Sequence, residues 1–560
     1  MTASGKVSME ESKAEETHGS CLKRVKGVIP LMYRRELVHL LKLAGPVVIS
    51  QLMIFMISFV STVFCGHLGK TELAGVALAI AVVNVTGICI GTGLSTTCDT
   101  LISQTYGSGN LKRVGVILQR GILILLLACF PCWAVLVNTE PLLLAVRQSP
   151  EVASLSQLYV KIVMPSLPAA FMYQLQGRYL QNQGIIWPQV ITGAIVNMFN
   201  AAINYVFLFP LDLGVAGSAA ANAISQYVLA GSLYVYIVAR GLHKATWGGW
   251  SRDCLQEWGP FVRLAIPSML MLCLEWWMFE IGGFLAGVIS EVELGAQSIS
   301  YQIAVVAYMS PMGFSAAASV RVGNALGAGN VEQAKISSKV PIICAFIISC
   351  FTAVIIALLR DVIAYIFTSD VEIVQRVSDV MILFAFNHMA DCIAGVIGGV
   401  VRGVGKPLTG ALCSLVGYYF LGIPIGITLM FVVGLGIVGL WVGLCICVYV
   451  QALFLIIFIC RLDWNKAAQE ALMRAGIQDK EENMSKIGNG DSSQKQIPMM
   501  PVGGEQEEAG PDPDPGRSTV VGDMLSGKQL VVRRSLALGV MVVILVIGIL
   551  ASHFLMLLLK

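Results

Sequence analysis

The sequence predicts an all-α membrane protein, built from two six-helix bundles related by a parallel pseudo-two-fold repeat and followed by a thirteenth transmembrane helix. Three observations support this fold class: the composition, the length of the apolar runs and an internal repeat. The chain of 560 residues is 56% hydrophobic and only 13% charged, whereas soluble domains carry about 25% charged residues. Many of its apolar runs are long enough to cross roughly 30 Å of hydrocarbon as a helix.

The apolar runs form two sets of six. Residues 1–37 are polar and basic and contain no apolar stretch of the kind found in signal peptides, so we expect an uncleaved cytoplasmic segment. The N-lobe (38–238) is expected to hold spans at about 38–58, 73–95, 118–137, 157–176, 188–209 and 214–238. A polar cytoplasmic connection (239–258) follows. The C-lobe (259–460) is expected to hold spans at about 259–283, 295–317, 338–358, 378–400, 409–431 and 435–459.

The C-terminal part combines a polar segment with one more apolar run. Residues 461–534 contain GGEQEEAGPDPDPG, and this low hydrophobicity with Pro, Gly and acids predicts a disordered cytoplasmic linker. Residues 535–560 are almost entirely apolar and predict the thirteenth helix, which places the C-terminus outside.

An internal repeat relates the two sets of spans. Four motifs recur at a nearly constant offset: Leu43-Ala-Gly-Pro46 as Leu264-Ala-Ile-Pro267, Glu72-Leu-Ala-Gly75 as Glu293-Leu-Gly-Ala296, Gly107-Ser-Gly-Asn110 as Gly327-Ala-Gly-Asn330, and Gly214-Val-Ala-Gly217 as Gly436-Ile-Val-Gly439. Because six spans separate the copies, both halves enter the membrane from the same side and the repeat is parallel. Paired halves of this kind are typical of carriers that rock around a central site.

Basic residues set the predicted orientation. Lys and Arg are more frequent in the connections on the side of the N-terminus, where we place Arg321 and Arg402 among others. The positive-inside rule then predicts a cytoplasmic N-terminus. The fifteen cysteines lie mostly within apolar runs, where a free thiol packs like a small hydrophobe, and the Cys129-Phe-Pro-Cys132 spacing is interpreted in the same way.

Six segments carry a family resemblance. They are QLMIFMISFVSTVFCGHLG (51–69), LAIAVVNVTG (78–87), CDTLISQTYGSGNLKRVGVILQR (98–120), ATWGGWS (245–251), RLAIPSMLMLCLEWW (263–277) and ASVRVGNALGAGN (318–330). On these motifs residues 38–460 resemble the multidrug and toxin extrusion (MATE) transporters, most closely the vertebrate branch. The resemblance implies export of organic cations and drug-like compounds in exchange for protons, across the plasma membrane.

Acids within the predicted spans are the main site candidates. Glu275 and Glu280 lie in the seventh span, and an ionised carboxylate at membrane depth usually marks an ion or substrate path. Their i, i+5 spacing separates them by about 140° around a helix, so both cannot point squarely at one small ligand. The tenth span carries His388 and Asp391, whose i, i+3 spacing predicts a shared face.

These acids suggest how a proton and a cation could be exchanged. Removing a carboxyl group from water favours its neutral form, which releases a cation that the charged form attracts. Aromatic rings nearby could add cation–π contacts of about 0.5–2 kcal/mol each. The aromatic candidates are Trp276, Trp277, Tyr301 and Tyr308, and the polar candidates of the first lobe are Gln51 and Asn84.

The sequence departs from the vertebrate family pattern at two positions. Gln302 stands where relatives commonly carry glutamate, and Asp391 is one methylene shorter than the usual glutamate. Gln302 is therefore a further site candidate, and its missing charge bears on the proton stoichiometry. Cys65 and Cys129 match family cysteines linked to thiol sensitivity, and we interpret both as packing residues near the pathway.

Two other functions stay open at this level: a sodium-coupled multidrug exporter, and a flippase of related fold for lipid-linked substrates. A flippase for phosphates would need a strongly cationic cavity, whereas acids dominate the candidates. The sequence holds no Walker A motif, nucleophile elbow or HExxH, so we predict that it is no enzyme and has no cofactor or metal site. The net charge of +3 indicates no nucleic-acid partner. The expected partners are organic cations, protons and the lipid bilayer, with the chain acting as a monomer.

Overall fold

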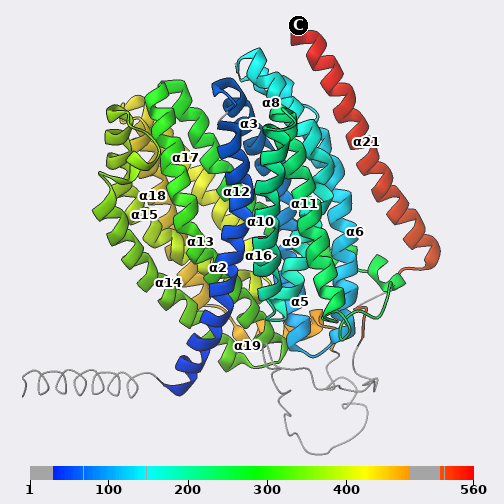
Figure 1. The fold of residues 1–560 in the computed structure, drawn as a ribbon. Helices are drawn as coiled ribbons and strands as arrows, with labels where there is room; N and C mark the ends of the chain where they lie inside the picture. Colours follow the sequence, from blue (N-terminus) through cyan, green and yellow to red (C-terminus); the bar gives the residue numbers. More distant parts are fainter. Residues whose placement is uncertain (1–29, 67, 147, 478–517, 522–523, 560) are drawn as a thin grey trace, which may run out of the picture.

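The computed structural model describes residues 30–66, 68–146, 148–477, 518–521 and 524–559. Helices make up the described part of the chain, and no β-strand occurs in it. Twelve of these helices are long and apolar enough to cross a membrane. Figure 1 shows them as two bundles placed side by side, with α2 and α12 between them and α21 along the outer flank.

The N-lobe begins with a long helix that contains Pro46. Its elements are α2 (Leu31–Gly66), α3 (Lys70–Val83), η1 (Asn84–Ile88), α4 (Cys89–Ser95), α5 (Thr97–Gly107), α6 (Leu111–Leu136), α7 (Thr139–Ala145), α8 (Pro150–Val163), η2 (Met164–Ser166), α9 (Leu167–Asn182), α10 (Trp187–Leu208) and α11 (Gly214–Ala239). The predicted fourth span is divided between α8 and α9 by η2, because Pro165 and Pro168 each remove a backbone N–H donor.

The C-lobe follows a short 3-10 turn, η3 (Arg252–Leu255). Its elements are α12 (Trp258–Ile289), α13 (Glu291–Gly327), α14 (Val331–Leu359), η4 (Ile363–Ile366), α15 (Val371–Val404), α16 (Pro407–Ser414), η5 (Leu415–Gly422), α17 (Ile423–Ile427), η6 (Thr428–Val432) and α18 (Ile437–Cys460). Segments α16 to η6 form one continuous run, Pro407–Val432, in place of the predicted eleventh span.

Backbone geometry repeats between the lobes as the sequence motifs do. Gly109 and Gly329 precede the equivalent helices α6 and α14 with φ of 76° and 72°. Gly214 and Gly436 stand at the start of the equivalent helices α11 and α18, with φ of 57° and 60°. A side chain is disfavoured at such positive φ, so glycine is required at matching places of both halves.

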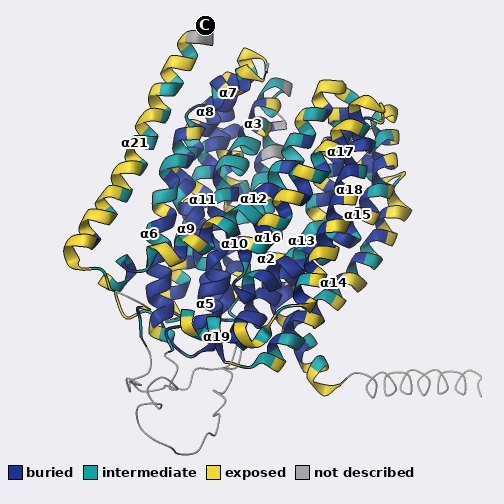
Figure 2. Cartoon of the chain, turned by 180° about the vertical axis from the view of Figure 1, so that it is seen from behind, coloured by how far each residue is buried: buried dark blue, intermediate teal, exposed yellow. Residues whose placement is uncertain are grey.

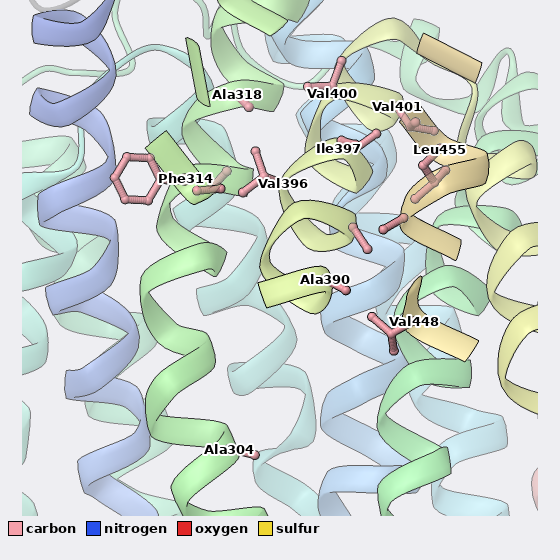
Figure 3. Close-up of a cluster of buried hydrophobic side chains, with 14 of the residues drawn as sticks. Ala304, Phe314, Ala318, Ala390, Val396, Ile397, Val400, Val401, Val448 and Leu455 are labelled. Carbon is pink, nitrogen blue, oxygen red and sulfur yellow. The ribbon is translucent and has the colours of Figure 1, made fainter. Parts of the chain in front are cut away.

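Apolar side chains fill each bundle and also cover its outside. In the C-lobe, Val396 and Val400 of α15 pack near Phe314 of α13, while Val448 and Leu455 of α18 lie close by (Figure 3). All five are at most 5% exposed. The outward faces carry many further exposed apolar residues, as lipid contact requires. In Figure 2 the buried residues concentrate between the helices.

The first helix of each half also contacts the other lobe. Helix α2 packs on α10 of its own lobe and on α13 of the C-lobe, and α12 packs on α16 of its own lobe and on α4 of the N-lobe. The Trp277 indole N–H donates to the Val85 carbonyl oxygen across this boundary, at 3.1 Å. The lobes therefore share two helices that a relative movement must displace.

One end of the lobe interface is closed by side chain–backbone hydrogen bonds, and we call it the sealed end. Gln104 of α5 donates to the Gly403 carbonyl oxygen at 2.8 Å, and Thr100 donates to that of Arg402 at 2.5 Å. A Cβ at Gly107 would overlap the backbone of Asn324, so glycine permits this close approach of α5 and α13.

Helix α19 (Trp464–Arg474) covers the sealed end, in a segment that sequence analysis assigned to a disordered linker. Asp463 caps its first turn by accepting from the backbone N–H groups of Asn465 and Lys466. Its alanines pack inward, and Arg474 donates to Gln104 of the N-lobe and to Val404 of the C-lobe. The helix forms because both lobes supply partners for it. The rest of the predicted linker lies largely outside the described residues.

The last helix, α21 (Gly527–Leu559), begins eight residues before the predicted thirteenth span. It lies against α6 and α7 of the N-lobe. Asn138 donates to the Gly548 carbonyl oxygen at 2.9 Å, and Ser552 donates to that of Val137 at 3.2 Å. Most of its surface is exposed (Figure 2), so few contacts join it to the rest of the molecule.

Two arginines lie elsewhere than sequence analysis placed them. Arg321 and Arg402 were assigned to cytoplasmic connections, but both lie inside helices and have little exposed surface. Arg321 donates to Glu36 of α2 at 2.9 Å, so this part of the predicted N-terminal segment is packed against the C-lobe. Each arginine is paired with a carboxylate, which makes its burial possible.

Candidate functional site

A cavity lies between the lobes, next to the sealed end. Helices of both lobes line it. Its polar lining residues are Gln51, Thr92, Thr96, Arg178, Ser268, Glu275, Tyr308, Ser315, Asp391, Arg402, Ser414, Tyr418 and Gln451. Two of the predicted acids, Glu275 and Asp391, therefore reach the same cavity although they belong to different predicted spans.

Helical periodicity explains why these two acids face the cavity. On α12 the lining residues Ser268, Leu272 and Glu275 follow the i, i+4, i+7 spacing of one helix face. On α15 the i, i+4 spacing places the lining residues Asp391 and Gly395 on one face of the helix. Tyr308 of α13 lines the same cavity as Glu275.

Glycine makes room for this tyrosine. A Cβ at Gly395 would overlap the Tyr308 hydroxyl oxygen. The side chains of Glu275 and Asp391 thus approach one another from two helices, with Tyr308 between α12 and α15.

A charged network forms the wall of the cavity at its sealed end. Asp99 of α5 is 2% exposed. Its carboxylate lies 3.3 Å from Nη1 of Arg178 on α9 and 3.6 Å from Nε of Arg402 on α15. Asn182 donates to its other oxygen at 3.3 Å. The Asp99–Arg402 pair joins the two lobes, although its members lie far apart in the sequence.

The charges around the cavity nearly cancel. Three carboxylates, from Glu275, Asp391 and Asp99, face two guanidinium groups, from Arg178 and Arg402. With all three acids ionised, one net negative charge remains. A proton on one acid, or a monovalent cation in the cavity, neutralises it.

Three neutral polar atoms on the cavity wall have no hydrogen-bond partner within the described part of the chain, in addition to Nε of Arg402. Oγ1 of Thr92, Oγ of Ser268 and Oε1 of Gln451 are buried, and none has a hydrogen-bond partner among the described residues. Buried polar groups are nearly always paired, so these atoms are available to water or to a bound molecule.

Other predicted site residues of the C-lobe lie outside this lining. Glu280 is five residues beyond Glu275, on another face of α12, and lies near Tyr301. The ring of Tyr301 packs on Phe279, with centroids 5.4 Å apart. Gln302 is exposed on α13.

The two tryptophans and the histidine are placed for packing. Trp276 is half-buried, and the indole N–H of Trp277 donates to the Val85 carbonyl oxygen. His388 is 1% exposed, with Nε2 3.4 Å from the Cys392 sulfur and its ring 5.6 Å from that of Phe384. The i, i+3 spacing predicted one face for His388 and Asp391, but the histidine points into the C-lobe core.

Asn84 belongs to a separate pocket inside the N-lobe. That pocket is lined by neutral residues, among them Tyr159, Tyr173, Gln174 and Asn222. Gln51, the other N-lobe candidate, lies on the inter-lobe cavity instead. The structure therefore brings Gln51, Glu275, Tyr308 and Asp391 together on the inter-lobe cavity, whereas Asn84 lies in a separate pocket and the other predicted site residues line neither.

Sequence analysis missed Arg178 and Arg402 as cavity residues. Arg402 was assigned to a cytoplasmic connection, and Arg178 was not considered. One signal was present: Arg402 follows Asp391 by eleven residues, which is three helical turns on the same face. No group of three or more His, Cys, Asp or Glu that could hold a metal occurs within the part of the chain that the structure describes.

Two repeated helical lobes that enclose a charged cavity near the middle of a membrane protein are the architecture of a secondary transporter. The MatE family model matches residues 46–206 and 267–428, one match in each lobe. The chain therefore belongs to the MatE family, and the predicted resemblance to MATE transporters and the predicted fold class are both confirmed. The two matches begin at residues 46 and 267, which are the two prolines Pro46 and Pro267 of the first repeated motif.

Curated relatives cover nearly the whole chain. Multidrug and toxin extrusion protein 1 of Danio rerio is 64% identical over 98% of this chain and 95% of its own length. Multidrug and toxin extrusion protein 2 of Mus musculus is 51% identical over 95% of this chain and 94% of its own length. These relatives are transporters, so this multi-pass membrane protein is a transporter and not an enzyme.

A solved structure has the same arrangement of helices. The eukaryotic MATE transporter AtDTX14 superposes with a TM-score of 0.77 at 29% identity, covering 79% of this chain and all of its own. The remaining fifth of the chain lies outside that match.

Proposed function

We propose that this protein exports organic cations and drug-like compounds in exchange for protons, and that Glu275 and Asp391 bind both. The observation that carries the proposal is their position: two carboxylates from separate helices line one cavity between the lobes. The names of the relatives, multidrug and toxin extrusion proteins, support the substrate class.

Competition for one negative charge supplies the coupling. Removal from water disfavours an ionised carboxylate, so each acid needs a counter-charge in the cavity. A proton or an organic cation provides it, and occupation by one excludes the other. The rings of Tyr308 and Tyr418 offer additional cation–π surface to the substrate.

The membrane orientation follows from the basic connections. We place the N-terminus in the cytoplasm, which makes the sealed end cytoplasmic and the conformation outward-facing, in the plasma membrane. Transport then requires that the sealed end opens while the opposite end closes. A single chain supplies both lobes and the whole cavity, so we propose a monomer as the working unit.

Vesicle transport tests the proposal. The purified full chain is reconstituted, and uptake of labelled tetraethylammonium is measured at clamped voltage with an acidic lumen, with and without sodium. We expect the pH gradient to accelerate uptake and sodium to leave it unchanged. An uptake rate that does not depend on the pH gradient would exclude proton coupling. An uptake rate that depends on a sodium gradient would favour the sodium-coupled alternative.

A charge-removing double variant identifies the site. Glu275→Gln with Asp391→Asn keeps the shape of both side chains and should abolish gradient-driven uptake. Glu291→Gln is the matched control, because Glu291 is exposed at the start of α13. If the double variant, at equal abundance, transported as the control does, the cavity would not be the transport site.

A further inference from the structure

Arg402 is shared between the two lobes. Its Nε lies 3.6 Å from the Asp99 carboxylate of the N-lobe, and Nη2 donates to Ser315 of the C-lobe at 3.0 Å. Nε has no hydrogen-bond partner among the described residues, although it is buried. The arginine is therefore held by one hydrogen bond within its lobe and by charge across the interface.

The other side of Arg402 faces the transport cavity. Asp391, Gly395, Gly398 and Arg402 follow one face of α15. Side chains in a helix lean toward its N-terminus, which directs the guanidinium toward the acids. The glycines let other side chains come close to this face. A Cβ at Gly398 would overlap Cε of Met271 and would lie 3.9 Å from Nη1 of Arg402, and a Cβ at Gly395 would overlap the Tyr308 hydroxyl.

Opening the sealed end would separate these charges unequally. Asp99 would keep Arg178 and Asn182, because all three belong to the N-lobe. Arg402 would move away with the C-lobe and lose its carboxylate. A buried guanidinium without a counter-charge is strongly unfavourable. Glu275 of the same lobe, which already interacts electrostatically with Arg402, can replace Asp99.

We propose that Arg402 is a positioning residue that exchanges Asp99 for Glu275 when the sealed end opens. This inference rests on the proposed proton/cation exchange. In the conformation described, Arg402 is engaged by Asp99, so Glu275 accepts a proton readily. In the opposite conformation Arg402 stabilises ionised Glu275, so the proton leaves on the cytoplasmic side. The exchange of partners thus gives the proton its direction.

Other ionisable groups surround the pair without supplying a competing positive charge to Glu275. Glu275 is faced by Tyr301 and Tyr308 of α13, Asp391 of α15, Tyr418 of η5, Cys447 of α18 and Cys89 of α4. Arg402 is faced by Asp99, Arg178, Tyr308 and Glu275. Arg402 is therefore the positive group that these interactions place within reach of Glu275.

Inside-out membrane vesicles from cells that produce the full chain test the proposal, because the bath then contacts the cytoplasmic face. Labelled tetraethylammonium uptake is driven by an acidic lumen while the bath pH is varied. In Arg402→Gln, Glu275 should keep its proton, so half-maximal uptake should shift to a more alkaline bath by about one to three pH units. Arg402→Lys keeps the charge and should restore the wild-type value.

A second assay separates this role from a structural one. Exchange of labelled for unlabelled tetraethylammonium at equal pH needs the same movement of the lobes but no proton release. Arg402→Lys, which keeps the charge of the cavity, should retain this exchange within about twofold of Arg461→Gln, a control at an exposed arginine at the end of α18. Arg402→Gln alters the cavity charge and so should change the KM of this exchange, but exchange should persist at saturating tetraethylammonium. If Arg402→Gln lost pH-driven uptake and tetraethylammonium exchange to the same extent, with the bath pH for half-maximal uptake unchanged, the proposal would be overturned.

Asp99→Asn tests the same link from the other lobe and keeps the proposal testable if Arg402→Gln fails to fold. Arg402 should then turn to Glu275 in both conformations. Proton loading from the lumen, which is the outer face, should need a more acidic lumen by about one to three pH units. If Asp99→Asn needed the same lumen pH as wild type for half-maximal uptake, the proposed exchange of partners would be contradicted. Wild-type uptake without any pH dependence would instead defeat the proposed function itself.

Discussion

Individual charges determine what the cavity can bind. When Glu275, Asp391 and Asp99 are all ionised, they exceed the positive charges of Arg178 and Arg402 by one negative charge. Burial makes that charge costly unless it is balanced. One proton or one monovalent cation balances it, and two bound together would not. This balance is the basis of the proposed exchange of a proton for a cation.

Glu275 is the first residue at which this balance can be tested. Glu275→Gln should fold normally but lower tetraethylammonium exchange more than about tenfold, because loss of one partner of a buried charge pair costs about 2–5 kcal/mol. Glu275→Asp, which withdraws the charge by one methylene, should raise KM more than it lowers the maximal rate. Both are measured in vesicles at equal protein abundance. Wild-type exchange by Glu275→Gln would show that the acid is dispensable.

Asp391 should respond differently to its two conservative replacements. Asp391→Glu restores the residue common in the vertebrate family, and we expect exchange within about threefold of wild type, since glutamate keeps both the charge and the exchangeable proton. Asp391→Asn should abolish proton coupling, because an amide cannot exchange a proton with the substrate. The comparison is made from initial rates under the same pH gradient. Activity of the asparagine variant with intact coupling would contradict the assignment.

Two elements join the lobes in different ways, one within the membrane and one at its surface. Helix α12 contacts α4 of the N-lobe inside the bundle, where Cys273 and Cys89 place their sulfur atoms 3.2 Å apart. Helix α19 contacts both lobes at the sealed end. Movement between the lobes must change the first contact and loosen the second.

The thiol pair gives a direct test of that movement. A membrane-permeant oxidant, diamide, takes the two thiol hydrogens and leaves a Cys89–Cys273 disulfide, which links α4 covalently to α12. We expect this bond, detected by mass spectrometry of the digested protein, to stop exchange, and dithiothreitol to restore it. Cys273→Ser should remove both effects, whereas Cys129→Ser should not. Cross-linked protein that transports normally would show that this contact stays fixed.

Charge holds α19 in place. Burial raises the pKa of Glu470, but the hydrogen bond and charge of Lys406, together with the charge of Arg474, outweigh this and hold the pKa below its usual value. Lys406 lies 2.7 Å and Arg474 lies 2.9 Å from the carboxylate. Because the folded pKa is lowered, this stabilisation is present above the ordinary glutamate value and is lost as the pH falls through the lowered one.

Glu470→Gln should therefore loosen α19 at neutral pH. We expect amide hydrogen exchange in Trp464–Arg474 to accelerate about fivefold, which corresponds to about 1 kcal/mol for an ion pair of this exposure. Glu332→Gln is the matched control, since Glu332 and its partner Lys335 are exposed. Protection of wild-type α19, corrected for intrinsic rates, should stay constant between pH 7 and pH 5. Exchange that rises over this interval would contradict the lowered pKa.

At the scale of the whole molecule, the two-lobe core and α21 differ in how many contacts they make with the rest of the protein. The core lobes pack through long helices and close around the cavity, whereas α21 touches α6 and α7 along one side and remains largely exposed (Figure 2). It supplies no residue to the cavity. It also has no counterpart in the repeat.

A chain that ends after Ile477 should therefore still transport. This truncation keeps α19 and its contacts with Gln104, and removes α21 together with the preceding segment. We expect vesicle exchange within about twofold of the full chain at equal insertion, because surface contacts away from the site contribute little to function. Protein that inserts at normal abundance but does not transport would show that α21 takes part in the mechanism.

Local patterns in the sequence are sufficient for the architecture of this protein. Helix length follows from the apolar runs, and the two halves follow from glycines and prolines that recur at a constant offset, because backbone conformation depends on nearby residues. The rarity of acids in apolar runs also identified Glu275 and Asp391. Local signals failed where the chain is irregular: α8 and α9 are divided by prolines, and α19 forms only because both lobes hold it.

The composition of the cavity was decided by tertiary structure alone. Hydropathy does not report how a helix is rotated against its neighbours, so it could not separate Glu275 from Glu280 or Asp391 from His388. Nor could it show that Arg402 belongs with Asp99, which lies in the other lobe and far away in the sequence. A buried arginine is possible only beside a carboxylate, and packing of the two lobes is what provides it.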